Sequence, residues 1–279
     1  MPARIDHVII AGPSLEALED AFTRLGFSVV GGGTHPHLGT RNRIIVLGEG
    51  YIELLAIADP ERASPMLRQR VAGGVAWVGY ALQSDDIEAE AQAMRARGVD
   101  VRGPTAGRLV APEGSARSWR VVTLGGDDLW AAALPLPFLI QHDSVGDTHR
   151  RELAGADPIG PHPNGARRLL GVILRTADPA TLRKRYERVF GLMLATTPTS
   201  ARFSLAGGQE WIALERAESA PGEAPAAMDD AAAEMSIHVK APDLAAVEAM
   251  ARAAGFACVA STDALRVSLP GGGQIEFSA

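Results

Sequence analysis

The sequence lacks a pair of cysteines and any long hydrophobic run. It has one cysteine in 279 residues, so no disulfide can form within the chain. No hydrophobic run approaches the roughly 18 residues that a membrane-spanning helix needs, and the first residues show no signal-peptide pattern. We therefore expect a cytoplasmic protein with no membrane partner.

Basic residues are also scarce. The chain has 27 lysines and arginines against 33 acidic residues, a formal net charge of −6, and the arginines are scattered along it. A nucleic-acid-binding surface needs concentrated positive charge, so we expect no nucleic-acid partner and expect a small-molecule substrate instead. Only 5% of the residues are aromatic, so an aromatic-lined cavity would have few residues to draw on.

A βαβββ pattern occurs four times along the chain. Its helices are predicted from apolar residues spaced three and four apart, and its strands from short apolar runs. The first predicted unit comprises strand 5–10, helix 15–25, a strand that begins with 27–30, and strands 43–47 and 51–57. The second comprises strand 75–82, helix 87–97, the turn 98–101, and strands 119–124 and 136–141. The third comprises strand 169–174, helix 181–190, and strands 201–205 and 211–214. The fourth comprises strand 235–240, helix 244–254, the segment 255–259, and strands 264–269 and 274–277. Such repetition indicates an internal-repeat architecture.

The units are expected to pair, because a curved βαβββ unit leaves one sheet face bare. The predicted fold class is α+β, with four modules forming two domains. The N-terminal domain covers 1–142, with modules 1–74 and 75–142, and the C-terminal domain covers 167–279, with modules 167–216 and 234–279. Residues 143–166, rich in Gly, Pro, His and charge, are predicted to be the linker. The polar stretch 217–233 is predicted to be a surface loop.

The segment Thr34–Ile57 concentrates polar chemistry within an apolar context. In its last strand, side chains alternate between faces, so Tyr51, Glu53 and Leu55 share one face. A buried carboxylate needs a partner. The candidates are a metal ion, His7, His35, His37, Arg41 and Arg43. The alternative is that Glu53 lies on a solvated edge or in an internal ion pair.

With these features, the chain resembles the vicinal oxygen chelate superfamily, which has the glyoxalase, bleomycin-resistance and dioxygenase fold. Within it, the segment is similar to the glyoxalase-like domain family, which carries a His-x-x-Gly-Thr-x-Asn segment followed by a Tyr-hydrophobic-Glu strand. The matching residues are His37, Gly39, Thr40, Asn42, Tyr51 and Glu53.

The resemblance implies a metal site built from the first and last strands of two paired modules. Aligned first strands place His7, Gly79, Gly171 and Ser236 together, and aligned last strands place Glu53, Gln141, Ala213 and Glu276 together. The implied ligands are therefore His7, Glu53 and Gln141, with His142, His35 and His37 as alternatives for the third position. A divalent Ni, Co, Mn, Fe or Zn ion would suit these donors. The C-terminal domain keeps only Glu276 and is expected to be structural or dimer-forming.

The resemblance also implies a lyase or isomerase that acts on a small oxygenated substrate. Glu53 would be a ligand or the proton-shuttling base, and His37 a second acid or base. Gly39, Thr40, Asn42 and Tyr51 would bind the substrate, or the turn residues would only satisfy local backbone groups. The alternative is a metal-free binding or sequestration protein with the same cavity. A homodimer is expected in either case.

Overall fold

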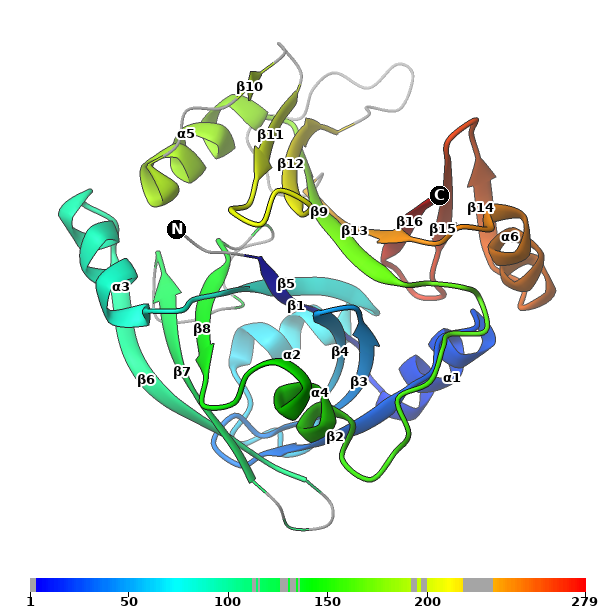
Figure 1. Cartoon of the computed structure of the whole chain (residues 1–279), viewed down its shortest axis with the longest axis horizontal. Coiled ribbons are helices and arrows are strands. Elements are labelled where there is room, and N and C mark those ends of the chain that lie inside the picture. The colour runs from blue at the N-terminus through cyan, green and yellow to red at the C-terminus, as the bar shows by residue number, and fades with distance from the viewer. Residues whose placement is uncertain are drawn as a thin grey trace.

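The computed structural model describes residues 4–111, 114, 116–125, 130, 134, 136–191, 195–196, 200–217 and 233–279. It contains two eight-stranded sheets, of which one closes into a barrel (Figure 1). Both sheets combine parallel and antiparallel pairs, and helices pack outside them. The predicted α+β class and the four paired modules are confirmed.

The barrel consists of the first two modules, in the strand order β1-β4-β3-β2-β6-β7-β8-β5. Within each module the first strand pairs in parallel with the last, and β1 pairs antiparallel with β5 to join the modules. The elements are β1 (Ile5–Ala11), α1 (Leu15–Arg24), β2 (Val30–His35), β3 (Thr40–Leu47), β4 (Gly50–Ile57), α2 (Pro65–Ala72), β5 (Ala76–Gln83), α3 (Ile87–Ala96), β6 (Val101–Val110), β7 (Ala116–Leu124) and β8 (Phe138–His142).

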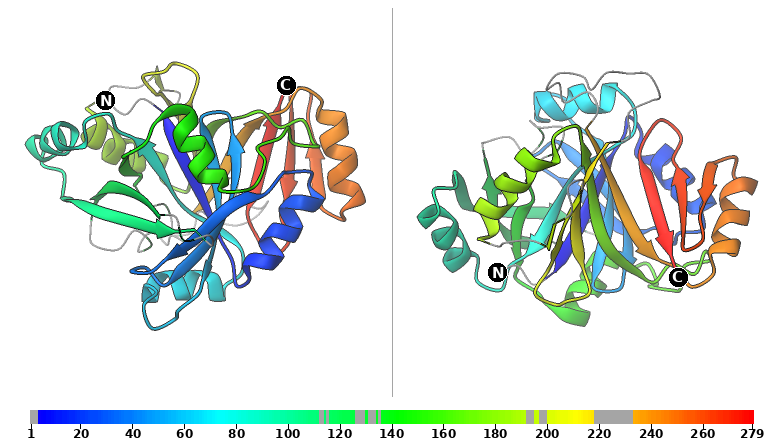
Figure 2. Two further views of the ribbon diagram at one scale, coloured as in Figure 1. Left: turned by 60° about the horizontal axis from the view of Figure 1, so that its bottom comes forward. Right: turned by 90° about the horizontal axis from the view of Figure 1, so that it is seen from above.

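The second sheet repeats this plan without closing, and Figure 2 shows it beside the barrel. Helix α4 (Gly146–Ala154) comes first and packs on β2 and β3 of the barrel. The remaining elements are β9 (Arg168–Thr176), α5 (Pro179–Phe190), β10 (Ala195–Thr196), β11 (Ser200–Ser204), β12 (Trp211–Arg216), β13 (Glu234–Lys240), α6 (Leu244–Ala253), β14 (Ala257–Ala260), β15 (Ala264–Ser268) and β16 (Gln274–Ser278).

The four module helices begin in the same way. In each, a serine or aspartate caps the helix by accepting a hydrogen bond from the backbone N–H three residues later; the capping residues are Ser14, Asp86, Asp178 and Asp243. Such a cap satisfies a backbone donor that the first helical turn leaves free. The cap therefore turns each first strand into its helix at the same point of every module.

The two sheets share one hydrophobic core. The hydroxyl groups of Tyr80 on β5 and Tyr186 on α5 lie 2.6 Å apart, and both rings are fully buried. The backbone N–H of Ile5 donates to the Glu210 carboxylate at 2.6 Å. The first bond connects β5, and the second connects β1, which carries site residues, to the second half of the chain.

Several elements were not predicted. Helix α2 lies between the first two modules and α4 inside the predicted linker 143–166. Strand β2 begins at Val30, three residues after the predicted start of that strand. Most of the predicted loop 217–233 lies outside the described residues. In the part of the chain that the structure describes, no helix is both long and apolar enough to cross a membrane.

Candidate functional site

The interior of the barrel contains a cavity with mainly apolar walls. The space open to the centres of water-sized molecules is ≈ 90 Å³, enough for several waters or one small ligand. Its polar lining residues are His7, His35, Thr40, Asn42, Tyr51, Glu53, Arg117 and His142, and its apolar lining includes Leu38, Leu55, Trp119, Trp130, Phe138 and Ile140.

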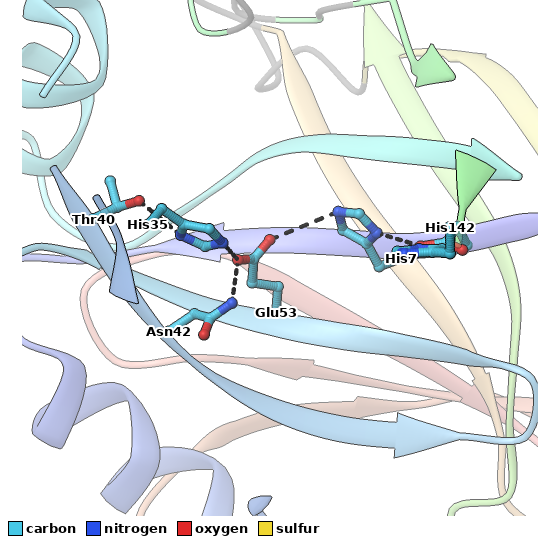
Figure 3. A network of polar contacts seen from close by, with 7 residues as sticks. His7, His35, Thr40, Asn42, Glu53 and His142 are labelled. Atoms are coloured by element: carbon cyan, nitrogen blue, oxygen red, sulfur yellow. Dashed lines mark hydrogen bonds and ion pairs between the residues drawn. The ribbon is translucent and has the colours of Figure 1, made fainter. Parts of the chain in front are cut away.

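Glu53 lies at the centre of the polar group. Its side chain comes from β4 and is 6% exposed. The amide Nδ2 of Asn42 donates to Oε1 at 2.6 Å, the Nε2 of His35 lies 3.7 Å from Oε1, and the Nε2 of His7 lies 3.7 Å from Oε2 (Figure 3). Glu53 therefore lies between two imidazoles, inside the cavity.

Each of these imidazoles has a polar contact at its other ring nitrogen, Nδ1. The Nδ1 of His7 donates to the Asp6 carboxylate at 2.6 Å, and the ring stacks on Tyr51 with centroids 4.6 Å apart. The Nδ1 of His35 lies 3.0 Å from the Thr40 hydroxyl. A partner on one ring nitrogen fixes the orientation of the other, so both Nε2 atoms face Glu53.

Burial and neighbouring charge set the ionisation of these groups. Burial lowers the pKa of His35 below its usual value, although the Glu53 charge opposes this. Burial, with the charge of Asp6, raises the pKa of the Tyr51 hydroxyl well above its usual value. His35 is therefore neutral at pH 7, and Tyr51 remains protonated.

A second polar cluster lies behind His7. The Nε2 of His142, at the end of β8, is 3.1 Å from the same Asp6 oxygen that His7 contacts, and the ring of His149 on α4 packs on His142 with centroids 4.0 Å apart. Burial alone would raise the pKa of Asp6, but His142 and His7 hold it far below its usual range. Burial lowers the pKa of His149 to about 3, and the charge of His142 contributes to this lowering.

The structure brings together five of the eight residues predicted for the site. His7, Thr40, Asn42, Tyr51 and Glu53 all line the cavity. Tyr51, Glu53 and Leu55 lie on the face of β4 that lines the cavity, as the alternation of side chains along the strand predicted. Their individual roles stay predictions.

The prediction for Gln141 is corrected, because this side chain lies outside the barrel. Its amide oxygen accepts from the backbone N–H of Ile87 and from Arg120, and its amide nitrogen donates to the Asp85 carbonyl. The neighbours Ile140 and His142 line the cavity instead. Adjacent residues of a strand face opposite sides of the sheet. An error of one residue in aligning the strands therefore selects a side chain that points away from the cavity.

The predicted roles of His37 and Gly39 are also corrected. His37 lies exposed in the turn between β2 and β3 and does not line the cavity. The N–H of Gly39 donates to the His35 carbonyl, and the Gly39 carbonyl accepts from Ala58 and Asp59. Gly39 therefore shapes the turn, and its N–H is not free to bind a substrate.

Asp6, His149, Arg117 and Trp130 were not predicted. Asp6 and Arg117 stand in strand segments with no distinguishing motif, and His149 lies in the predicted linker. The C-terminal counterpart Glu276 is bound to Arg175 at 2.5 Å and lies 3.4 Å from Arg266, while His238 bonds to Ser278. In the second sheet, the positive charge beside this carboxylate therefore comes from two arginines.

A barrel of two paired βαβββ modules with a carboxylate and imidazoles inside it defines a protein of the vicinal oxygen chelate class. The chain belongs to the glyoxalase-like domain family, which matches residues 5–190. No curated protein matches the sequence.

Solved structures share the whole fold at low sequence identity. A hypothetical protein from Staphylococcus aureus is 16% identical with a TM-score of 0.72, covering 99% of this chain and 98% of that one. A mutant of 4-hydroxymandelate synthase from Streptomyces coelicolor is 13% identical with a TM-score of 0.60, covering 99% and 92%. A fusion of a xylose isomerase-like TIM barrel with 4-hydroxyphenylpyruvate dioxygenase is 14% identical with a TM-score of 0.60, covering 100% and 49%. These likenesses concern the fold alone.

Proposed function

We propose that the protein is a lyase or isomerase that moves a proton on a small oxygenated substrate in the barrel cavity. The observation that carries the proposal is the position of Glu53, a buried carboxylate between two imidazoles in an otherwise apolar cavity. Buried carboxylates in clefts are frequent acid and base groups.

The two oxygens of Glu53 have different surroundings. Oε1 accepts the short bond from Asn42, whereas Oε2 lies 3.7 Å from the Nε2 of His7, beyond hydrogen-bond distance. Oε2 is thus able to take a proton from a C–H group beside a carbonyl, while Asn42 fixes the carboxylate.

His7 provides a route for that proton. Because its Nδ1 proton is donated to Asp6, its Nε2 can accept the proton from Glu53. The resulting imidazolium would be stabilised by the ionised Asp6, as an aspartate orients and stabilises a catalytic histidine in other sites. Return of the proton to a neighbouring substrate atom completes an isomerisation. If the bond to a leaving group breaks instead, the proton is transferred to that leaving group and completes an elimination.

The metal site implied for His7, Glu53 and Gln141 does not fit these residues. Gln141 faces away, and Oε1 of Glu53 receives an amide donor from Asn42. Among the described residues, the one group with three ligand atoms mutually within 4.8 Å is Asp6, His142 and His149. No step of the proposed proton transfer therefore uses a metal bound to Glu53.

The cavity wall indicates the class of substrate. Within the described part of the chain, Arg117 is the one arginine or lysine that lines the cavity, and its Nε is buried without a hydrogen-bond partner. A guanidinium suits a carboxylate, and Trp119, Trp130 and Phe138 suit a flat or apolar group. Enolisable dicarbonyl compounds that carry a carboxylate, and 2-hydroxy acids, combine these features with a weakly acidic C–H bond.

The test is deuterium incorporation from D₂O at the carbon beside the oxygenated group, followed by NMR over a panel of these two compound classes. Glu53→Gln should lower the exchange rate roughly 10²- to 10⁴-fold. Glu49→Gln, which alters an exposed carboxylate paired with Arg4, should exchange as the wild type does. Exchange by folded Glu53→Gln at the wild-type rate, or no exchange by the wild type across the panel, would contradict the proposal.

A metal-free binding protein is the second candidate, and the aromatic walls favour it. Tyr51, Trp119, Trp130 and Phe138 surround the cavity in spite of the low aromatic content of the chain. This candidate predicts saturable quenching of tryptophan fluorescence by panel compounds without exchange, in the wild type and in Glu53→Gln alike. The exchange and quenching measurements together therefore separate turnover from sequestration.

A further inference from the structure

Three elements bring potential metal ligands to one point at the barrel wall. Asp6 comes from β1, His142 from the last position of β8 and His149 from α4. One ligand atom from each lies within 4.8 Å of the other two. Ligand atoms about 2.0–2.2 Å from one ion lie at most about 4.4 Å apart, so the group would tighten around an ion, and the packed rings of His142 and His149 would turn to direct a nitrogen at it.

His149 is the residue whose surroundings call for a further partner. Its side chain is 8% exposed, and its Nε2 is buried without a hydrogen-bond partner. The Nδ1 has a distant contact with the Ser144 hydroxyl at 3.4 Å, and the ring packs on His142. A buried polar atom without a partner destabilises the folded state, and a metal bond at Nε2 would supply that partner.

The charges of the cluster suit a cation. Asp6 is 3% exposed, and its carboxylate has contacts with His7 and His142 and with the Tyr51 hydroxyl. Neutral imidazoles and an ionised carboxylate are the forms in which these side chains bind metals. Two histidines and one carboxylate, with positions left for water, form a set found around divalent first-row transition metals.

We infer that Asp6, His142 and His149 bind one divalent transition-metal ion, with Zn²⁺ or Fe²⁺ as the ions that best suit the donor set. The ion would replace the direct contact between His142 and Asp6, whereas the bond from His7 to Asp6 would remain and support the ligand from behind. The site differs from the one implied by the resemblance, because it uses neither Glu53 nor Gln141.

The site goes beyond the proposed proton transfer. Its third ligand comes from α4, in the segment that connects the two sheets, so the ion would fix this helix to the barrel. His142 lines the cavity, whereas Asp6 and His149 do not. The ion would therefore lie at the edge of the cavity, separated from Glu53 by His7.

The experiment measures metal content by elemental analysis. The full-length protein is stripped with a chelator, incubated with ZnSO₄ and separated from free Zn²⁺ by gel filtration. The wild type should retain one equivalent, and His149→Gln should retain none, a larger effect than the roughly 10- to 100-fold cost of losing a supporting residue. Far-UV circular dichroism checks that the variant is folded, and His142→Gln is the second variant if it is not.

Two control variants distinguish this site from zinc binding elsewhere on the chain. His238→Gln alters a buried histidine that bonds to Ser278 in the second sheet, and Glu53→Gln alters the centre of the cavity. Both should retain one equivalent of Zn²⁺. No binding by the wild type, wild-type binding by folded His149→Gln and His142→Gln, or loss of binding in Glu53→Gln would each overturn the inference.

Discussion

The Leu153 carbonyl of α4 occupies the place where a side chain at Gly31 would stand. A Cβ built on Gly31 would lie 1.8 Å from that oxygen, and Gly31 has φ +51°, a left-handed conformation that favours glycine. The N–H of Gly31 also donates to Asp157, beyond the end of α4, at 2.8 Å. The glycine thus allows α4 to contact β2 and so places His149 beside His142.

Gly31→Ala should therefore displace α4. We expect a loss of about 3 kcal/mol or more in the free energy of unfolding, measured by urea denaturation, because backbone strain and steric overlap combine. Gly98→Ala is the matched control, since Gly98 has φ +75° and nothing within 4 Å of its Cβ position. This control should lose only about 1–2 kcal/mol. Equal losses would show that the contact with α4 contributes nothing.

Asn42→Asp should destabilise the protein through Glu53. The substitution replaces the amide donor with a carboxylate 2.6 Å from Glu53, whereas the Asn42 oxygen that accepts from Gly33 is kept. Repulsion between two buried carboxylates raises one of the two pKa values, so the loss, about 2–3 kcal/mol at pH 8, should shrink near pH 5. Urea denaturation at both pH values measures it.

The double variant Asn42→Asp/Glu53→Gln tests the origin of that loss. It reverses the direction of the hydrogen bond, so most of the lost stability should return. Asn42→Ala removes the donor without adding charge and should show no comparable change between the two pH values. A pH-independent loss in Asn42→Asp would rule out carboxylate repulsion as its cause.

The sequence predicted those parts of the fold and the site that depend on local pattern. The helix caps and the alternation in β4 were sufficient to find the modules and to direct Glu53 into the cavity. The third ligand position was assigned wrongly because one residue separates Gln141 from His142. A shift of one residue in a strand exchanges its two faces.

The parts of the fold and of the site that were not predicted depend on contacts between segments distant in the sequence. Helix α4 has three buried residues, His149, Leu153 and Ala154, which is too weak a pattern to predict a packed helix within a polar segment. Its position depends on Gly31, more than a hundred residues away. Neither Asp6 nor Arg117 carries a local signal, because each matters only through the side chains that the closed barrel brings near it.

Arg117→Gln should weaken the binding of anionic ligands. Loss of a charge-assisted hydrogen bond costs about 1.5–3 kcal/mol, so the dissociation constant of phenylacetate should rise about 10- to 100-fold, as measured by quenching of the fluorescence of Trp119 and Trp130. The neutral analogue phenylacetamide should bind both proteins alike. Arg120→Gln is the control, because Arg120 lies on the same strand but pairs with Glu88 and Gln141 outside the cavity. An equal effect in both variants would contradict a specific role for Arg117.

His162 should make the stability of the protein depend on pH. Its Nδ1 accepts from the N–H of Ser28 at 3.0 Å and its Nε2 donates to the Val46 carbonyl at 2.8 Å, so the neutral ring is the form that fits. Burial lowers the pKa of His162, although the Val46 carbonyl opposes this. The unfolded state therefore binds the proton more readily than the folded state does. The contribution of His162 is complete above the unfolded pKa of about 6.5 and is lost as the pH falls from there through the lower folded pKa.

The measurement is the free energy of unfolding at about pH 7.5 and about pH 5, for the wild type and for His162→Gln. The variant should be less stable at the higher pH but should lose less stability than the wild type between the two values, because it lacks the ring whose pKa is lowered by burial. His149, whose pKa is lowered to about 3, acts in the same direction and remains in both proteins, so the difference isolates His162. His37→Gln, which changes an exposed histidine, should follow the wild type. The same pH dependence in His162→Gln as in the wild type would show that the ring is not held neutral by these two bonds.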